Sequence, residues 1–119
     1  MTKPATKLFK MSEMAFADYG GPPGKATIAR LVGPDLSTTM GAGIATFDGC
    51  SLAWTVLYDE LIVGIKGLFR LRVGDEVFEA GPGDVIWIPE GTALKYEGEG
   101  ATVFYALHPV HWKQKHGLG

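Results

Sequence analysis

The sequence predicts a single all-β domain, a barrel or a sandwich of short strands, and three observations support this class. The chain has 119 residues, of which 46% are hydrophobic and 20% are charged, as expected for one globular domain. It contains 17 glycines, which are unfavourable inside helices and useful in tight turns. From Gly64 onward, turn signals recur at short intervals between apolar runs of strand length.

The first half of the chain contains three predicted strands, at residues 26–32, 41–47 and 52–57. Asp48 and Gly49 separate the last two and indicate a hairpin. Residues 18–25 are rich in glycine and proline and are predicted to form a loop. Ser12 is a suitable N-cap for a short helix that would run to Phe16.

The second half is more regular and contains six predicted strands. Gly74-Asp75 indicates a tight hairpin, and further turns are predicted at Gly67, 81–84, 90–91 and 98–100. The strands between these turns are expected at residues 61–66, 68–73, 76–80, 85–88, 93–97 and 102–107.

Two of these strands, around residues 61–65 and 85–88, are apolar on both faces. Such strands are usually covered on both sides. In a barrel one face fills the interior, so the other must meet a second sheet, the N-terminal segment or another subunit. We therefore predict a homodimer, with an N-terminal arm (1–24), a barrel (25–112) and a C-terminal tail (113–119).

The charge pattern and cysteine content exclude several classes of partner and setting. The formal net charge is −2, whereas nucleic-acid-binding proteins usually carry a basic surface. There is no apolar run of membrane-spanning length, and residues 1–9 contain no apolar core of the length expected in a signal peptide. Cys50 is the single cysteine, so no internal disulfide can form. We expect a cytoplasmic protein that binds neither nucleic acid nor membrane.

Two segments resemble the signature motifs of the cupins, which are RmlC-like, double-stranded β-helix barrels related to the jelly roll. Gly83 is followed after five residues by Pro89 and then by Gly91, as in the second cupin motif. Glu60 is followed after six residues by Gly67, as in the second half of the first motif. The resemblance implies a cupin barrel.

The resemblance extends to one cupin branch, the ethanolamine-utilisation family EutQ, over residues 26–112. The segments that carry it are 41–43, 53–55, 58–60 and 83–89. This resemblance implies a role in amine catabolism, bacterial microcompartment or pathway proteins as partners, and an acetate kinase activity. The residues themselves include no phosphate-binding loop that would explain a kinase.

The metal-binding histidines that the cupin motifs contain are replaced in this chain. Depending on the spacing, the two histidines of the first motif fall on Ala53 and Thr55 or on Trp54 and Val56, and that of the second motif falls on Leu94. Glu60 alone keeps a ligand type, and a metal site needs three or four ligands. We therefore predict neither a metal nor another cofactor.

Glu60 is the principal candidate for a functional residue. If its carboxylate faces the barrel interior, it needs a partner or its pKa rises, which is a common property of functional groups. If it lies at the mouth of the barrel, it is simply solvated. Trp54 or Trp87 could form a wall of the same cavity, and the candidate ligand-binding tyrosines are Tyr58, Tyr96 and Tyr105. Packing in the core is the alternative role for each of these aromatic residues.

The remaining charged residues are expected mainly on the surface. Lys66, Arg70, Arg72 and Lys95 alternate with apolar residues, which predicts an exposed strand face, although one of them could reach the pocket to hold an anion. The C-terminal His108, His111 and His116 do not have the spacing of a zinc site.

Two functions remain open from the residues, and the family resemblance adds a third, a structural or assembly partner in a metabolic complex. The first is a domain that binds a small polar or anionic metabolite in the barrel without a metal. The second is a metal-independent enzyme, an isomerase, an epimerase or an acyl or phosphoryl transferase, in which Glu60 acts as acid or base with Tyr58 or Tyr96 as its partner.

Overall fold

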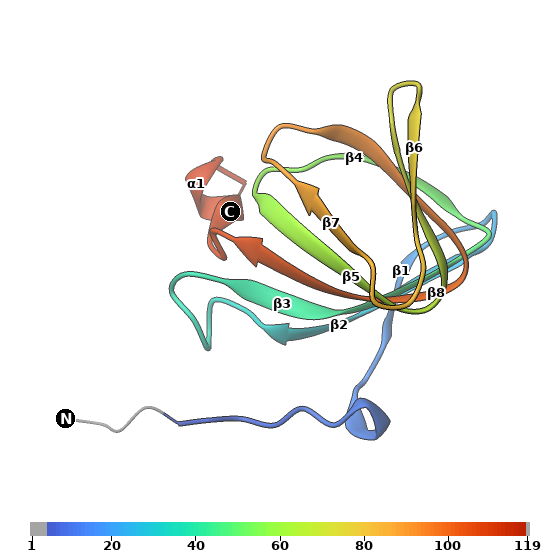
Figure 1. Cartoon of the computed structure of the whole chain (residues 1–119). Helices are drawn as coiled ribbons and strands as arrows, with labels where there is room; N and C mark the ends of the chain where they lie inside the picture. Colours follow the sequence, from blue (N-terminus) through green and yellow to red (C-terminus); the bar gives the residue numbers. More distant parts are fainter. Residues whose placement is uncertain (1–4, 119) are drawn as a thin grey trace.

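The computed structural model describes residues 5–118 and shows an antiparallel β-barrel with two very short helices (Figure 1). This confirms the all-β class. Residues 1–4 of the predicted arm and residue 119 of the predicted tail lie outside the described residues. The strands are β1 (Ala17–Gly20), β2 (Lys25–Val32), β3 (Gly41–Asp48), β4 (Ser51–Thr55), β5 (Asp59–Val73), β6 (Glu76–Ala80), β7 (Val85–Ile88) and β8 (Ala93–His108). The helices are η1 (Met11–Glu13) and α1 (Trp112–Lys115).

Two long strands, β5 and β8, form the spine of the barrel. They pair with each other from Asp59↔His108 to Arg72↔Lys95. β4 pairs with the first part of β8, and β3 pairs with the last part. In the same way β7 pairs with the first part of β5, and β6 with the last part. The order β1-β2-β3-β8-β5-β6 places β2 and β5 on walls separated by two strands.

The long strands bend where the sequence predicts turns, but they do not end there. The ladder between β5 and β8 shifts register between Gly64 and Leu68. Gly67 and Gly100 both have positive φ, and a Cβ on Gly67 would meet the carbonyl oxygen of Gly100. Glycine in a strand often marks a bulge or a barrel corner. The prediction of separate strands on either side of Gly67 and of residues 98–100 is therefore wrong, because these glycines bend a continuous ladder.

Smaller elements agree with the sequence in some places and differ in others. The hairpin at Gly74-Asp75 is confirmed, since β5 and β6 pair with each other on either side of it. The hairpin predicted at Asp48-Gly49 is wrong, because β3 and β4 each pair with β8 instead of with each other. The loop predicted at residues 18–25 is wrong in its first part, because Ala17–Gly20 form β1, which pairs with β2. The predicted helix from Ser12 to Phe16 is also wrong. The structure has only the single turn η1, which follows Lys10 and has no side-chain cap.

The aromatic core closes one end of the barrel and forms the floor of a cavity. The rings of Phe47 and Phe69 lie 5.3 Å apart, and those of Phe47 and Tyr96 lie 5.6 Å apart. Phe69 is almost fully buried, whereas Phe47 and Tyr96 also line the cavity. At the other end, α1 lies beside the start of β5 and the end of β8 (Figure 1).

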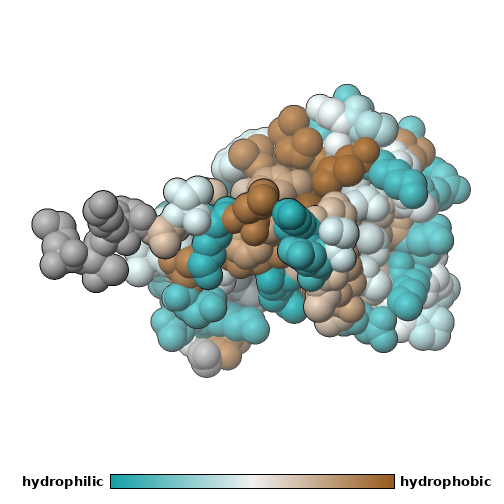
Figure 2. Space-filling view, turned by 90° about the horizontal axis from the view of Figure 1, so that it is seen from below, coloured by the Kyte–Doolittle hydropathy of each residue, from teal (hydrophilic) through white to brown (hydrophobic). Residues whose placement is uncertain are grey.

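The outer face of β5 and β7 is apolar and exposed in the single chain. Val85 is 60% exposed, Trp87 59% and Leu61 43%. Leu61 pairs with Trp87 across the two strands, so these side chains are neighbours. Figure 2 shows apolar residues gathered over the middle of one face of the molecule, with hydrophilic residues predominant at its right-hand end.

In the described residues, no helix is long and apolar enough to cross a membrane.

Candidate functional site

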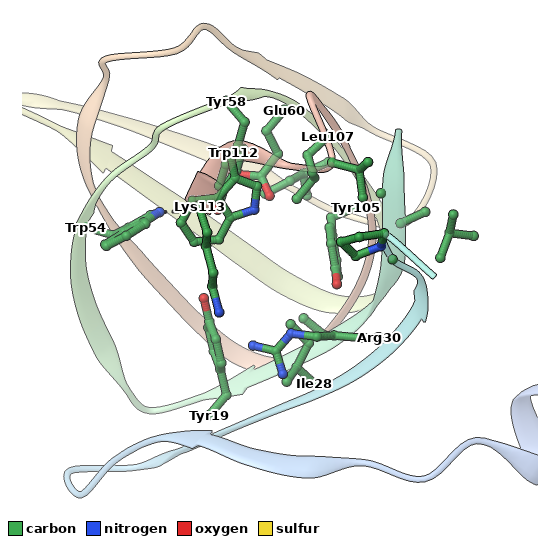
Figure 3. A pocket seen from close by; sticks show the side chains of 18 of the residues that line it. Tyr19, Ile28, Arg30, Trp54, Tyr58, Glu60, Tyr105, Leu107, Trp112 and Lys113 are labelled. Atoms are coloured by element: carbon green, nitrogen blue, oxygen red, sulfur yellow. Dashed lines mark hydrogen bonds between the residues drawn. The ribbon is translucent and has the colours of Figure 1, made fainter. Parts of the chain in front are cut away.

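A cavity of about 410 Å³ lies inside the barrel, between β2, β3, β5 and β8, with α1 at its edge (Figure 3). Its volume suits a small metabolite. The five aromatic and acidic candidates from the sequence all line it: Trp54, Tyr58, Glu60, Tyr96 and Tyr105. Trp87, the other tryptophan considered as a wall, is not among the lining residues and lies on the exposed outer face.

Glu60 lies inside the barrel and is only 5% exposed. It shares the inward face of β5 with Ile62, because alternate residues of a strand point to the same side. The Tyr96 hydroxyl donates a hydrogen bond to Oε1 of Glu60 over 2.7 Å. Burial raises the pKa of the Glu60 carboxyl to about 7, and the Tyr96 hydrogen bond opposes this rise. Glu60 is therefore a carboxyl group that changes charge near neutral pH.

An aromatic wall stands next to Glu60. The indole Nε1 of Trp54 donates a hydrogen bond to the Tyr58 hydroxyl over 3.2 Å. The Trp112 ring lies 5.2 Å from the Tyr58 ring and 6.0 Å from the Trp54 ring, measured between centroids. Burial and the nearby charge of Glu60 raise the pKa of Tyr58. Tyr58 therefore stays neutral at physiological pH.

The opposite wall carries a positive charge. Arg30 of β2 lines the cavity, and its guanidinium carbon lies 5.8 Å from the centre of the Tyr19 ring. The Tyr105 ring lies close over Gly43, where an added Cβ would come within 2.7 Å of the tyrosine hydroxyl. Gly43 therefore leaves room for this ring in the cavity. Burial raises the pKa of Tyr105 to about 12.

Several lining residues were not singled out from the sequence: Tyr19, Arg30, Trp112 and Lys113. Arg30 follows Ile28 by two residues, so strand alternation alone places it on the inward face. The others come from segments outside the core strands. Trp112 and Lys113 lie in α1, in a region whose sequence gives only a weak structural signal.

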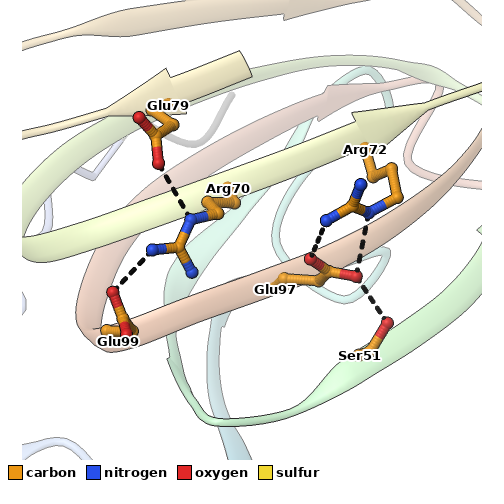
Figure 4. A network of polar contacts seen from close by, with 6 residues as sticks. All are labelled: Ser51, Arg70, Arg72, Glu79, Glu97 and Glu99. Carbon is orange, nitrogen blue, oxygen red and sulfur yellow. Dashed lines mark hydrogen bonds and ion pairs between the residues drawn. The ribbon is translucent and has the colours of Figure 1, made fainter. Parts of the chain in front are cut away.

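Two of the four basic residues that the sequence placed on an exposed strand face, Arg70 and Arg72, form ion pairs outside the cavity (Figure 4). Arg70 pairs with Glu79 over 2.9 Å and with Glu99 over 2.6 Å. Arg72 pairs with Glu97 over 3.1 Å. Hydrogen bonds from Arg72 and from Ser51 lower the pKa of Glu97. The positively charged residues that line the cavity are Arg30 and Lys113 rather than any of the predicted candidates.

The C-terminal histidines do not gather into one site. His111 lines the cavity, whereas Nε2 of His116 lies 3.3 Å from a carboxylate oxygen of Glu90. Among residues 5–118, no three histidine, cysteine, aspartate or glutamate side chains are grouped so that they could hold a metal ion. The donors around Glu60 are phenols and an indole, which do not fit the metal site that the cupin fold implies.

The eight-stranded antiparallel barrel and its internal cavity define the class of protein: this is a cupin. The RmlC-like cupin from Shewanella frigidimarina has the same fold, with a TM-score of 0.68 and 14% identity over 88% of this chain and 92% of that one. Within this class the chain belongs to the EutQ family, because the model for ethanolamine utilisation protein EutQ matches residues 3–114. The family resemblance of the sequence is thus confirmed.

Two comparisons with Salmonella typhimurium proteins agree with this assignment. The protein named acetate kinase EutQ is 27% identical over 113 residues, which are 93% of this chain. The chain spans about half the length of that relative, 49%. The crystal structure of ethanolamine utilisation protein Q has a TM-score of 0.80 and 27% identity, and the match covers 88% of this chain and 87% of that one.

Proposed function

We propose that this chain binds a small polar or anionic metabolite in the barrel cavity without a metal ion, in a pathway of amine catabolism. The observation that carries the proposal is a cavity of about 410 Å³ in which Glu60 and Arg30 stand among aromatic and apolar walls. Metabolite sites commonly combine such walls with a few polar groups that fix the orientation of the ligand. The family's name supports the pathway, since its members are described by ethanolamine utilisation.

The three tryptophans provide a direct test of binding in this cavity. Trp54 and Trp112 line it, whereas Trp87 is exposed on the outer face. A Trp87→Phe variant therefore restricts indole fluorescence to the cavity. We expect at least one compound in a panel of small carboxylates, phosphates and amines to change the emission of this variant saturably. A panel that leaves the emission unchanged, or that changes only the wild type, contradicts the proposal.

A second function, proton-transfer catalysis by Glu60, is favoured by the pKa of this carboxyl near 7. A group with a pKa near the working pH is well suited to act as a general acid or base. Tyr96, which is hydrogen-bonded to Glu60, and Tyr58 would be its partners. The relative's name supplies one reaction to assay, the formation of acetyl phosphate from acetate and ATP. For catalysis through Glu60, Glu60→Gln should reduce turnover by about 100-fold or more.

A further inference from the structure

The cavity holds charges of both signs, on opposite walls. Resting on the proposed function, we propose that its ligand is a small zwitterion, with an ammonium group beside Glu60 and the neighbouring aromatic rings and an anionic group between Arg30 and Lys113. Figure 3 shows Glu60 and Arg30 on opposite sides of the cavity, with Lys113 reaching across its mouth toward Tyr19.

Glu60 offers a free acceptor for the ammonium group. It has no ion-pair partner among residues 5–118, and its Oε1 accepts the only side-chain hydrogen bond that it makes there. In these residues no fully buried polar side-chain atom lacks a partner. The second carboxylate oxygen of Glu60 must therefore reach the open space of the cavity. A ligand N–H group can bind it there.

The rings around Glu60 suit the same group. Trp54, Tyr58 and Trp112 line the cavity. The ring centroid of Trp112 lies 5.2 Å from that of Tyr58 and 6.0 Å from that of Trp54. Electron-rich rings attract ammonium groups, and a desolvated site strengthens this attraction. A carboxylate with such rings beside it favours a cation over a neutral hydroxyl group.

The positively charged side chains of the cavity are placed to bind an anionic group. Arg30 and Lys113 line the cavity, and neither forms an ion pair within residues 5–118. Lys113 contacts the Trp112 ring, with its Nζ 5.5 Å from the ring centre. Arg30 lies against Tyr19. A carboxylate, phosphate or sulfonate can accept hydrogen bonds from both cations, and such charge-assisted bonds are the strong ones.

A ligand that is only an anion would affect Glu60 differently. An ammonium group beside Glu60 lowers the pKa of its carboxyl, so binding near pH 7 releases a proton. An anion alone raises that pKa, so binding takes up a proton. The charged and titratable groups that face Glu60 from the surrounding elements are Tyr19, Arg30, Tyr58, Tyr96, Tyr105, His111 and Lys113. Of these, the tyrosines described above have raised pKa values and stay neutral at pH 7.

The test uses the full chain and ω-amino acids from β-alanine to 6-aminohexanoate, each matched to the alkanoate and the alkylamine of the same length. Calorimetry gives the affinities, and an indicator dye in weakly buffered solution at pH 7 gives the proton change. We expect at least one amino acid to bind about tenfold more tightly than both of its matched compounds, with proton release. Equal affinity for the alkanoate, or proton uptake, overturns the zwitterion proposal.

Variants assign the two ends of the ligand. Glu60→Gln should remove the preference for the amino acid over the alkanoate. Lys113→Gln should weaken binding of the amino acid about tenfold, and this residue is exposed, so its substitution is compatible with folding. Lys115→Gln is the matched control, since Lys115 lies on the same helix and pairs with Glu90 over 3.6 Å, outside the cavity. An equal effect of both lysine variants contradicts the proposed anion site.

The outcomes separate this inference from the function on which it rests. If no amino acid binds but an anion from the wider panel changes the fluorescence of the Trp87→Phe variant, the cavity binds metabolites and the zwitterion proposal fails. If neither the amino acids nor the panel give a ligand, both proposals fail.

Discussion

Glu60 connects the chemistry of the cavity with the stability of the fold. Burial raises the pKa of its carboxyl from 4.5 to about 7, so the folded protein favours the neutral form. Between these two values the folded state binds more protons than the unfolded state. Stability linked to this group is therefore complete below pH 4.5 and is lost as the pH rises through 7.

We expect wild type to lose on the order of 3 kcal/mol of unfolding free energy between pH 4.5 and 8, relative to Glu60→Gln. Glutamine has a similar shape, can still accept a hydrogen bond from Tyr96, and does not ionise. Urea denaturation of both proteins at several pH values measures the difference. Parallel pH profiles for the two proteins would show that Glu60 is ionised in the fold at neutral pH.

At the scale of single residues, the sequence identified acidic and aromatic residues of the cavity but not its two positively charged residues. Glu60 was identified from the family motif, and Tyr58, Tyr96 and Tyr105 were named as tyrosines that could line the same cavity. The structure places all four in its lining. Arg30 was missed, although alternation places it beside Ile28. Lys113 could not be predicted, because its position depends on how the segment after β8 folds back over the barrel.

The bend in β5 and β8 depends on the absence of a side chain at Gly67. Gly67 has a φ of 70° and packs against the Gly100 carbonyl, whereas Gly74 has a φ of 59° and no atom within 4 Å of an added Cβ. Alanine at either position bears the strain of positive φ, about 1–3 kcal/mol. Only Gly67→Ala also forces the two strands apart.

We therefore expect Gly67→Ala to destabilise the protein clearly more than Gly74→Ala, by at least about 1 kcal/mol. Urea denaturation of the two variants and wild type measures this difference. Because the φ values are similar, the excess reports the contact with Gly100. Equal losses of unfolding free energy in the two variants would mean that moving the strands apart at Gly67 and Gly100 costs no stability.

Most strands were predictable because short apolar runs and turn residues alternate regularly. Several of the errors concern glycines, whose sequence signal is ambiguous. Gly74-Asp75 does end a strand, whereas Gly67 bends one. What distinguishes them is the partner across the ladder, Gly100 for Gly67, and no local pattern contains that information.

At the scale of the whole molecule, the exposed apolar face of β5 and β7 is expected to bind another protein surface. Leu61, Val85 and Trp87 are exposed on adjacent strands, and exposed apolar patches commonly mark interaction sites. We propose that a second copy of the chain covers this face, as the sequence predicted from strands that are apolar on both sides.

Sedimentation velocity tests this proposal. We expect wild type to sediment as a dimer, and Trp87→Lys to shift it toward monomer because a charge at the centre of an apolar interface is costly to desolvate. Lys66→Glu serves as a control for the change of charge alone, since Lys66 is already an exposed polar residue of β5. A monomeric wild type, or a dimer unaffected by Trp87→Lys, contradicts the proposed interface.

The pairing of β5 with β8 also determines the order in which the barrel assembles. Arg72 pairs with Lys95 across a short stretch of chain, whereas Asp59 pairs with His108 across a much longer one. Closing the longer loop costs more chain entropy, so the ladder should zip from the Arg72 end toward Asp59. Glu60 is then expected to take its place among the last residue pairs of this ladder to form.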